Sequence, residues 1–275
     1  MTVGGATLFA QGGGTKKVSI QFRPMVGAEP FACGRSYQGI GTSKETITPS
    51  DFAFYIYDAK LTTTDGKDVP VTLDQDGPFQ NGTLALLDFT DGTGPCSNAG
   101  TLSHTAVTGT VPQGKYVGIR FTIGVPFERN HLDLTTQPSP LSLTRMFWAW
   151  NSGHKFVRFD AKTATGKTWL FHLGSTGCTP TTSPSTVPTT CAQPNRVAVT
   201  LPRFDVNADV IVADAGALFA LSGGADNQVC MSSAKSAACA PNFAALGLPL
   251  NGSSPGAQVF LRAVPAGKPA DAPKK

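Results

Sequence analysis

The chain has 275 residues, of which only 15% are charged, and its formal net charge is +4. Lys and Arg form no cluster apart from the terminal Lys274 and Lys275, which argues against the concentrated basic face that nucleic-acid binding needs. No segment approaches the roughly 20 consecutive apolar residues that cross a bilayer, so we expect a protein that does not span a membrane. A chain of this length builds a full hydrophobic core and needs no metal merely to fold.

Residues 1–16 include most of the run QGGGTKK and lack the charged start and apolar run of a signal peptide. We expect them to be a flexible segment ahead of the folded domain. Low charge together with six cysteines indicates an oxidising compartment, hence a periplasmic or secreted protein with disulfide bonds. Six cysteines allow 15 pairings, and nearest-neighbour pairing joins Cys178 with Cys191 and Cys230 with Cys239, which leaves Cys33 with Cys96. No C-x-x-C occurs, which argues against thiolate ligation of zinc or iron–sulfur.

Segments with apolar residues at every second position dominate the chain, and this period is typical of strands. The first lies at 16–26 and the next at 51–61, after which Asp65-Gly66 provides a hairpin turn. Short helical pieces are predicted near 146–151 or 242–247. Further strands are predicted at 82–89, 115–125, 155–163, 168–174, 196–204 and 209–218.

Turn signals recur about every ten residues, which is the spacing of sandwiches and barrels. We therefore predict an all-β protein, an antiparallel β-sandwich or barrel-like single domain with disulfide-stapled loops. The domain is expected over residues 17–263, with a disordered tail over 264–275. We expect a monomer.

Enzyme motifs are absent from the sequence: there is no G-x-S-x-G, no H-E-x-x-H, no phosphate-binding loop and no dinucleotide fingerprint. We therefore expect that the protein is not an enzyme. Asp74 and Asp76 resemble part of a calcium loop, but the glutamate that closes such a loop is missing, which favours a surface turn.

Two of the three tryptophans stand one residue apart, as Trp148 and Trp150 in RMFWAWNSGHKF. In a strand both point to the same face and fill a core, or together they form a binding surface. His172 is the most informative of the four histidines, because strand alternation pairs it with Leu170 and sets Trp169, Phe171 and Leu173 on the other face. A histidine in so apolar a strand bonds a backbone group or binds a ligand.

Four segments, in this order, resemble the MbnP family of bacterial copper-binding proteins: GVPFERNHLD, PLSLTRMFWAWNSGHKFVRFD, WLFHLGSTGC and CAQPNRVAVTLPRFD. With the earlier segments FACG, DFAFYIYDAKL and LDFTDGTGPC, the likeness runs from about Val18 to Phe260. The family is also described as the four-Cys partner in a "metallo-mystery pair", and more distantly it resembles the proteins MopE and CorA.

The resemblance implies that Trp148, the first tryptophan of the W-x-W motif, is oxidised to kynurenine by a partner of the MbnH kind. Such partners are diheme enzymes related to bacterial cytochrome c peroxidases and MauG. His131 and His172 match the family's motif positions, and with the modified Trp148 they are the implied ligands of one copper ion. His154 and Met146 are less favoured alternatives.

Physical chemistry agrees with this implied ligand set. An indole nitrogen only donates a hydrogen bond, whereas the arylamine of kynurenine has a lone pair for a metal. Two neutral imidazoles and a neutral amine form an uncharged site that suits Cu(I) better than a hard dication. The implied function is copper homeostasis, or copper acquisition alongside a methanobactin system.

The alternative from another class is a secreted β-sandwich carbohydrate-binding or adhesion module. In that case Trp148 and Trp150 would form a platform on which a sugar stacks. The histidines distinguish the two hypotheses, because a sugar platform has no need for imidazoles next to a tryptophan.

Overall fold

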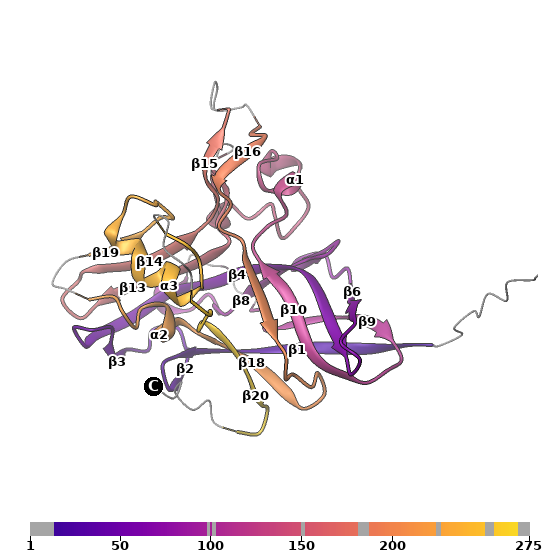
Figure 1. Cartoon of the computed structure of the whole chain (residues 1–275). Helices are drawn as coiled ribbons and strands as arrows, with labels where there is room; N and C mark the ends of the chain where they lie inside the picture. The colour runs from indigo at the N-terminus through magenta and orange to yellow at the C-terminus, as the bar shows by residue number, and fades with distance from the viewer. Residues whose placement is uncertain are drawn as a thin grey trace, which may run out of the picture.

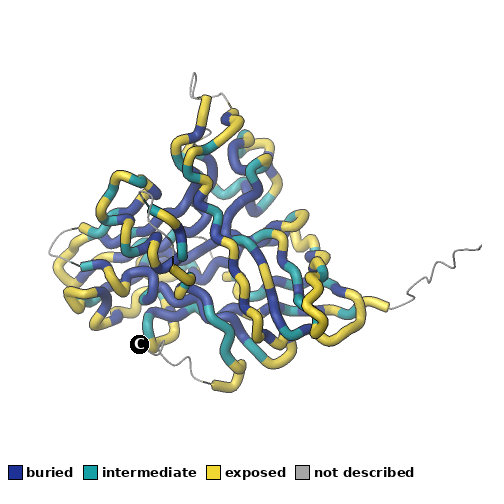
Figure 2. Tube along the Cα trace, viewed as in Figure 1, coloured by how far each residue is buried: buried dark blue, intermediate teal, exposed yellow. Residues whose placement is uncertain are grey.

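Two large β-sheets share one hydrophobic core in the computed structural model, which describes residues 14–97, 100, 103–149, 152–180, 187–223, 227–250 and 256–268 (Figure 1). Aromatic rings join the two sheets, since Phe22 of the first contacts Phe54 and Phe121 of the second at 6.0 and 6.1 Å between ring centroids. Buried backbone follows the central strands of both sheets (Figure 2). The predicted all-β, sandwich-like fold is therefore confirmed.

The first sheet has the order β20 (Leu261–Pro265), β18 (Asp209–Asp214), β1 (Thr15–Val26), β9 (Ala106–Pro112) and β6 (Thr72–Leu73), with β2 (Glu29–Pro30) beside β1. The second has the order β17 (Val197–Leu201), β10 (Tyr116–Ile123), β4 (Glu45–Thr63), β13 (Val157–Thr163), β14 (Thr168–Leu173) and β19 (Gln228–Cys230). Its additional strands are β3 (Tyr37–Ile40), β5 (Asp68–Pro70), β8 (Leu84–Asp88) and β7 (Gln80–Asn81). Most neighbouring strands are antiparallel, but β1 with β18 and β14 with β19 are parallel.

Two small ribbons complete the strands: β11 (Phe147–Ala149) with β12 (Gly153–His154), and β15 (Thr176–Thr179) with β16 (Thr190–Gln193). The second ribbon projects from the body of the molecule next to α1 (Figure 1). Helices are short: α1 (Phe127–Asn130), α2 (Ala215–Leu218), α3 (Ala240–Ala245), and the 3-10 turns η1 (Gly94–Cys96), η2 (Leu134–Thr136), η3 (Thr144–Met146) and η4 (Ala237–Cys239). Among the described helices, none has the length and apolar character to cross a membrane.

The strand predicted over 209–218 is too long. It ends at Asp214, whose carboxylate accepts a hydrogen bond from the backbone N–H of Ala217 and begins α2. A polar cap thus outweighs the alternating pattern. Of the two predicted helical pieces, 242–247 overlaps α3, whereas 147–149 is strand β11.

Three disulfides staple the loops, and they are the predicted ones: Cys33–Cys96, Cys178–Cys191 and Cys230–Cys239. The ordered strands run from Thr15 at the start of β1 to Pro265 at the end of β20. Residues 1–13 and 269–275, which carry most of the predicted flexible segment and tail, lie outside the described residues, as does Trp150.

Phe52 of β4 lies at the centre of the aromatic core. It is fully buried, and its ring contacts five others at centroid distances from 4.9 to 6.3 Å: Phe31, Phe54, Phe89, Phe159 and Phe260. Phe52→Ala should lower the free energy of unfolding by about 3–5 kcal/mol, because it removes this packing and leaves a cavity. Urea unfolding measures the loss. Val187→Ala, at a residue 46% exposed, is the control and should change stability by less than about 0.5 kcal/mol.

Candidate metal centre

Trp148 lies half-buried in the short strand β11, with its indole ring against Gly174 at the end of β14. A methyl group on Gly174 would lie 2.5 Å from Cζ3 of Trp148 and 2.7 Å from the carbonyl oxygen of His154. Only glycine therefore leaves room for the indole on the strand. The sequence W-L-F-H-L-G thus places a histidine and a ring-sized gap on the same face of β14, two residues apart.

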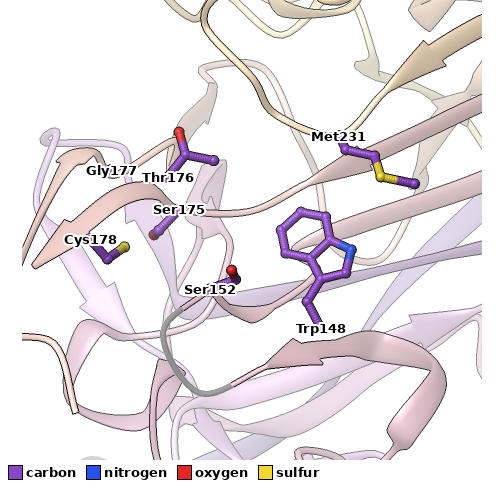
Figure 3. Close-up of a pocket in the computed structure, with 7 residues that line it drawn as sticks. All are labelled: Trp148, Ser152, Ser175, Thr176, Gly177, Cys178 and Met231. Atoms are coloured by element: carbon purple, nitrogen blue, oxygen red, sulfur yellow. The ribbon is translucent and has the colours of Figure 1, made fainter. Parts of the chain in front are cut away.

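The exposed side of Trp148 forms one wall of a cavity of about 430 Å³ (Figure 3). The other lining residues are Ser152, Ser175, Thr176, Gly177, Cys178 and Met231. Met231 lies on the side of the indole that carries the nitrogen, and Cys178 lies on the opposite side (Figure 3). Trp148 is therefore anchored on one side and open to a cavity large enough for a small ligand on the other.

His172 is the imidazole next to Trp148, at 6.3 Å between ring centroids. Its Nε2 lies 2.6 Å from Oδ1 of Asp160. A carboxylate only accepts, so Nε2 carries a proton and donates; in the neutral form of the ring the lone pair is then on Nδ1. Nδ1 is buried and has no hydrogen-bond partner among the described residues. The predicted alternation of β14 is also observed, because Trp169, Phe171 and Leu173 are fully buried on the core face.

Asp160 belongs to a charged network beneath the indole. Its Oδ2 accepts from Nη2 of Arg158 at 2.7 Å, and Nε of Arg158 lies 3.1 Å from Asp51. Asp51 in turn binds Arg145 at 2.6 Å, and Arg145 also pairs with Asp88. Because Arg145 precedes Trp148 by three residues, this network fixes the segment that carries the tryptophan. Its six members come from five elements: Asp51 from β4, Asp88 from β8, Arg145 from η3, Arg158 and Asp160 from β13, and His172 from β14.

Burial raises the pKa of Asp160, but the hydrogen bond and the charge of His172, together with the charge of Arg158, outweigh burial and hold the pKa at about 2. The carboxyl group is therefore ionised at neutral pH and acts only as an acceptor. This state is the one that fixes the imidazole of His172 with its proton on Nε2.

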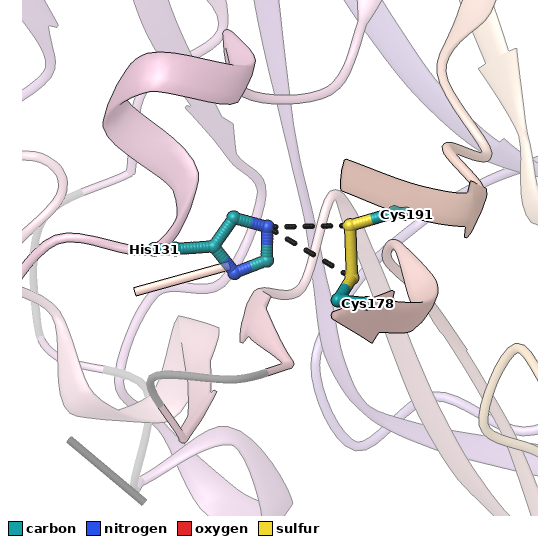
Figure 4. A group of neighbouring side chains, drawn as sticks. All are labelled: His131, Cys178 and Cys191. Atoms are coloured by element: carbon teal, nitrogen blue, oxygen red, sulfur yellow. Dashed lines mark hydrogen bonds between the residues drawn. A yellow bond between two sulfur atoms is a disulfide. The ribbon is translucent and has the colours of Figure 1, made fainter. Parts of the chain in front are cut away.

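His131 is placed elsewhere, at the C-terminal end of α1 and against the Cys178–Cys191 disulfide (Figure 4). Its Nε2 lies 3.5 Å from Sγ of Cys191, 3.9 Å from Sγ of Cys178 and 3.1 Å from Nδ2 of Asn130. Cys178 also lines the Trp148 cavity, so the Cys178–Cys191 disulfide borders both His131 and this cavity. The three ligand atoms of His131, Cys178 and Cys191 lie within 4.8 Å of one another, but the disulfide leaves no thiolate for a metal.

The two alternative ligands, His154 and Met146, are both buried in the protein interior. His154 is buried, with Nδ1 3.0 Å from the carbonyl oxygen of Asn130 and Nε2 2.9 Å from that of Leu141. Burial lowers its pKa. Met146 is fully buried in the core. The structure thus brings His172 to Trp148 and places His131 against the Cys178–Cys191 disulfide, while His154 and Met146 are buried in the fold and are not among the residues that line the cavity.

Three features of the centre were not identified from the sequence. The charged network joins strands distant in the chain, although the alternation of Arg158 and Asp160 in VRFD marked a polar strand face. The role of Gly174 depends on its packing partner. Met231 could have been found from the sequence, because it directly follows Cys230 in QVCMSS, where a disulfide holds a soft thioether side chain in place.

The fold and this centre together define a disulfide-stapled β-sandwich protein with a tryptophan and an imidazole at the edge of a cavity. The family model for MbnP matches residues 15–233, and the chain belongs to the MbnP family. The solved structure of MbnP from Methylosinus trichosporium is similar, with a TM-score of 0.78 and 28% sequence identity over 92% of this chain and 99% of that chain. A comparison with the curated proteins finds no match. Family membership makes this chain a copper-associated, methanobactin-related protein.

The low pKa of Asp160 predicts a specific dependence of stability on pH. A carboxyl group with a pKa of about 2 in the folded protein and near its ordinary value of 3.8 in the unfolded chain stabilises the fold above pH 4, and this contribution is lost as pH falls through 2. Asp160→Asn should therefore lower the free energy of unfolding by about 2 kcal/mol at pH 7 and by much less at pH 2. Urea unfolding at both pH values measures this.

Glu45→Gln on β4 serves as the matched control for the charge change and should shift stability by less than about 0.5 kcal/mol at either pH. If Asp160→Asn lowers the free energy of unfolding by the same amount at pH 7 and at pH 2, the electrostatic role of the carboxylate is contradicted.

Proposed function

We propose that this protein binds one copper ion, as Cu(I), at a kynurenine formed from Trp148, and that it serves copper homeostasis or copper acquisition in the periplasm or outside the cell. Membership of the MbnP family supports the copper association. The chain is the substrate of a diheme enzyme of the MbnH kind and is not itself an enzyme.

The observation that carries this proposal is that Nδ1 of His172, next to Trp148, has no hydrogen-bond partner in the part of the chain that the structure describes. A buried imidazole nitrogen without a partner is costly unless a ligand uses it. The hydrogen bond from Nε2 to Asp160 has the form in which a carboxylate orients a metal-binding histidine and fixes its tautomer. The residues present therefore fit a metal, with Nδ1 of His172 as the ligand atom.

Oxidation gives Trp148 its own ligand atom. Four electrons leave the indole and are accepted by two molecules of hydrogen peroxide at the partner's hemes. The C2–C3 bond of the indole breaks and each of these two carbons gains an oxygen atom. Two molecules of water leave. One water then hydrolyses the resulting formamide, so that formic acid departs and kynurenine remains. The former indole nitrogen becomes an arylamine with a lone pair. The half-exposed position of Trp148 at the cavity supports access by the partner.

His131 enters the proposal as the second imidazole through its position in the family motif. In the described structure its ring packs against the sulfur atoms of Cys178 and Cys191, and Cys178 also lines the cavity beside Trp148. An imidazole pair with an arylamine is neutral, and such a set favours Cu(I) over Ca²⁺ or Mg²⁺, which take oxygen ligands.

The sugar-platform alternative gains little from the geometry. Atoms Cζ3 and Cη2 of the Trp148 ring lie against Gly174, and a buried imidazole lies beside the ring, whereas a stacking platform needs an open aromatic surface.

The modification is tested by peptide mass spectrometry across residues 146–155, on protein produced with and without the diheme partner. With the partner, Trp148 should gain one oxygen and lose one carbon. Trp148→Phe is the control and should show neither this change nor retained copper. Full modification at another residue, with Trp148 intact, would reject the proposal.

The ligand role of His172 is tested by His172→Gln, because a glutamine amide still donates to Asp160 but removes the imidazole lone pair. The affinity of the kynurenine-containing protein for Cu(I) should fall by more than about tenfold, as measured by competition with bicinchoninate. His104→Gln is the matched control, since His104 stacks on Phe79 outside the centre. Equal affinities for both variants would show that His172 is not a ligand.

A further inference from the structure

We propose that the thioether of Met231 is a further copper ligand of this site, positioned at the mouth of the cavity to take Cu(I). This inference rests on the proposed function. It assigns a ligand that the family motifs around His131, Trp148 and His172 do not include.

Strand register brings Met231 to the site. Strands β14 and β19 are parallel and pair Phe171 with Cys230, so the next residues along each strand are His172 and Met231. Phe171 and Cys230 are both fully buried on the core side. Because side chains alternate along a strand, His172 and Met231 leave on the other side, where Trp148 lies. Met231 and Trp148 accordingly line the same cavity (Figure 3).

The backbone at Met231 is held firmly on both sides. Cys230 is fixed to Cys239 by a disulfide. Ser232 has a φ of 62°, in the left-handed region that a non-glycine residue rarely adopts, and its side chain is fully buried. Its Oγ donates to the carbonyl oxygen of His172 and accepts from the N–H of Gly174, each at 2.8 Å. The turn that presents Met231 is thus bonded to the two residues of β14 that frame Trp148, and strained backbone of this kind is concentrated at functional sites.

The exposure of Met231 distinguishes it from the other described methionines. Its side chain is 50% exposed, whereas Met25 and Met146 are 2% and 0% exposed in the core. A rigid turn that holds a large apolar side chain half in solvent gains little from packing, but it leaves the sulfur accessible. A thioether is neutral and soft, so it adds a donor that prefers Cu(I) without adding charge.

The other sulfur atoms of the described chain are unsuited to this role. All six cysteines are in disulfides. A sulfur bound to copper at this centre is therefore assigned to Met231, and this makes the inference testable by spectroscopy.

The experiment uses the full chain, produced with the diheme partner and loaded with Cu(I). X-ray absorption at the copper edge should show a sulfur neighbour in the wild type and none in Met231→Leu. The affinity of the variant for Cu(I), in competition with bicinchoninate, should fall at least about tenfold. Met231→Leu keeps the size and apolar character of an exposed side chain, so its fold is expected to be intact. Met25→Leu is the matched control and should retain both the sulfur signal and the affinity.

The outcomes separate this inference from the function on which it rests. Copper bound with only nitrogen or oxygen neighbours, at equal affinity in wild type and Met231→Leu, would overturn the role of Met231 and leave the proposed function standing. A sulfur signal that persists in Met231→Leu would also overturn it. If the kynurenine-containing wild type binds no copper, the proposed function and the inference both fail.

Discussion

The hydrogen bond between His172 and Asp160 is the constraint on which the centre depends. It determines which imidazole nitrogen carries the proton, and so it leaves a lone pair on the nitrogen that has no partner in the described chain. The carboxylate holds this position because Arg158 binds its other oxygen. Through Arg158 the same network reaches Asp51 and Arg145, and so fixes the backbone just before Trp148. One set of charges therefore positions both the imidazole and the tryptophan.

The rest of the fold provides space and rigidity around these two side chains. Gly174 has no side chain and so leaves room for the indole of Trp148, and the aromatic core beneath β14 keeps the strand in place. On the solvent side the cavity is bounded by residues next to two disulfides, at Cys178 and after Cys230. In the proposed function, a tryptophan held on one side and open on the other is the residue that the partner modifies. The proposed donors are all neutral, and a neutral set favours a soft monovalent ion.

Much of the scaffold is predictable from the sequence, because it follows from local periodicity and from cysteine spacing. The strands around Val18, Phe54 and Phe171 and all three disulfides are examples. The charged network is not predictable in this way, since it depends on the register of β4 and β13 and on η3, which carries Arg145. Met231 comes to His172 only through a parallel pairing of strands almost sixty residues apart, for which no turn signal exists. His131 illustrates the opposite case: its motif is clear, but only the structure shows that its ring packs against the Cys178–Cys191 disulfide.

Anomalous X-ray diffraction at the copper edge, from crystals of the protein produced with its diheme partner, locates the bound metal relative to His172 and position 148. We expect a single copper peak bonded to Nδ1 of His172 and to the arylamine of the residue formed from Trp148. A peak bonded to Nε2 of His131 and remote from position 148, with His172 still unligated, would contradict it.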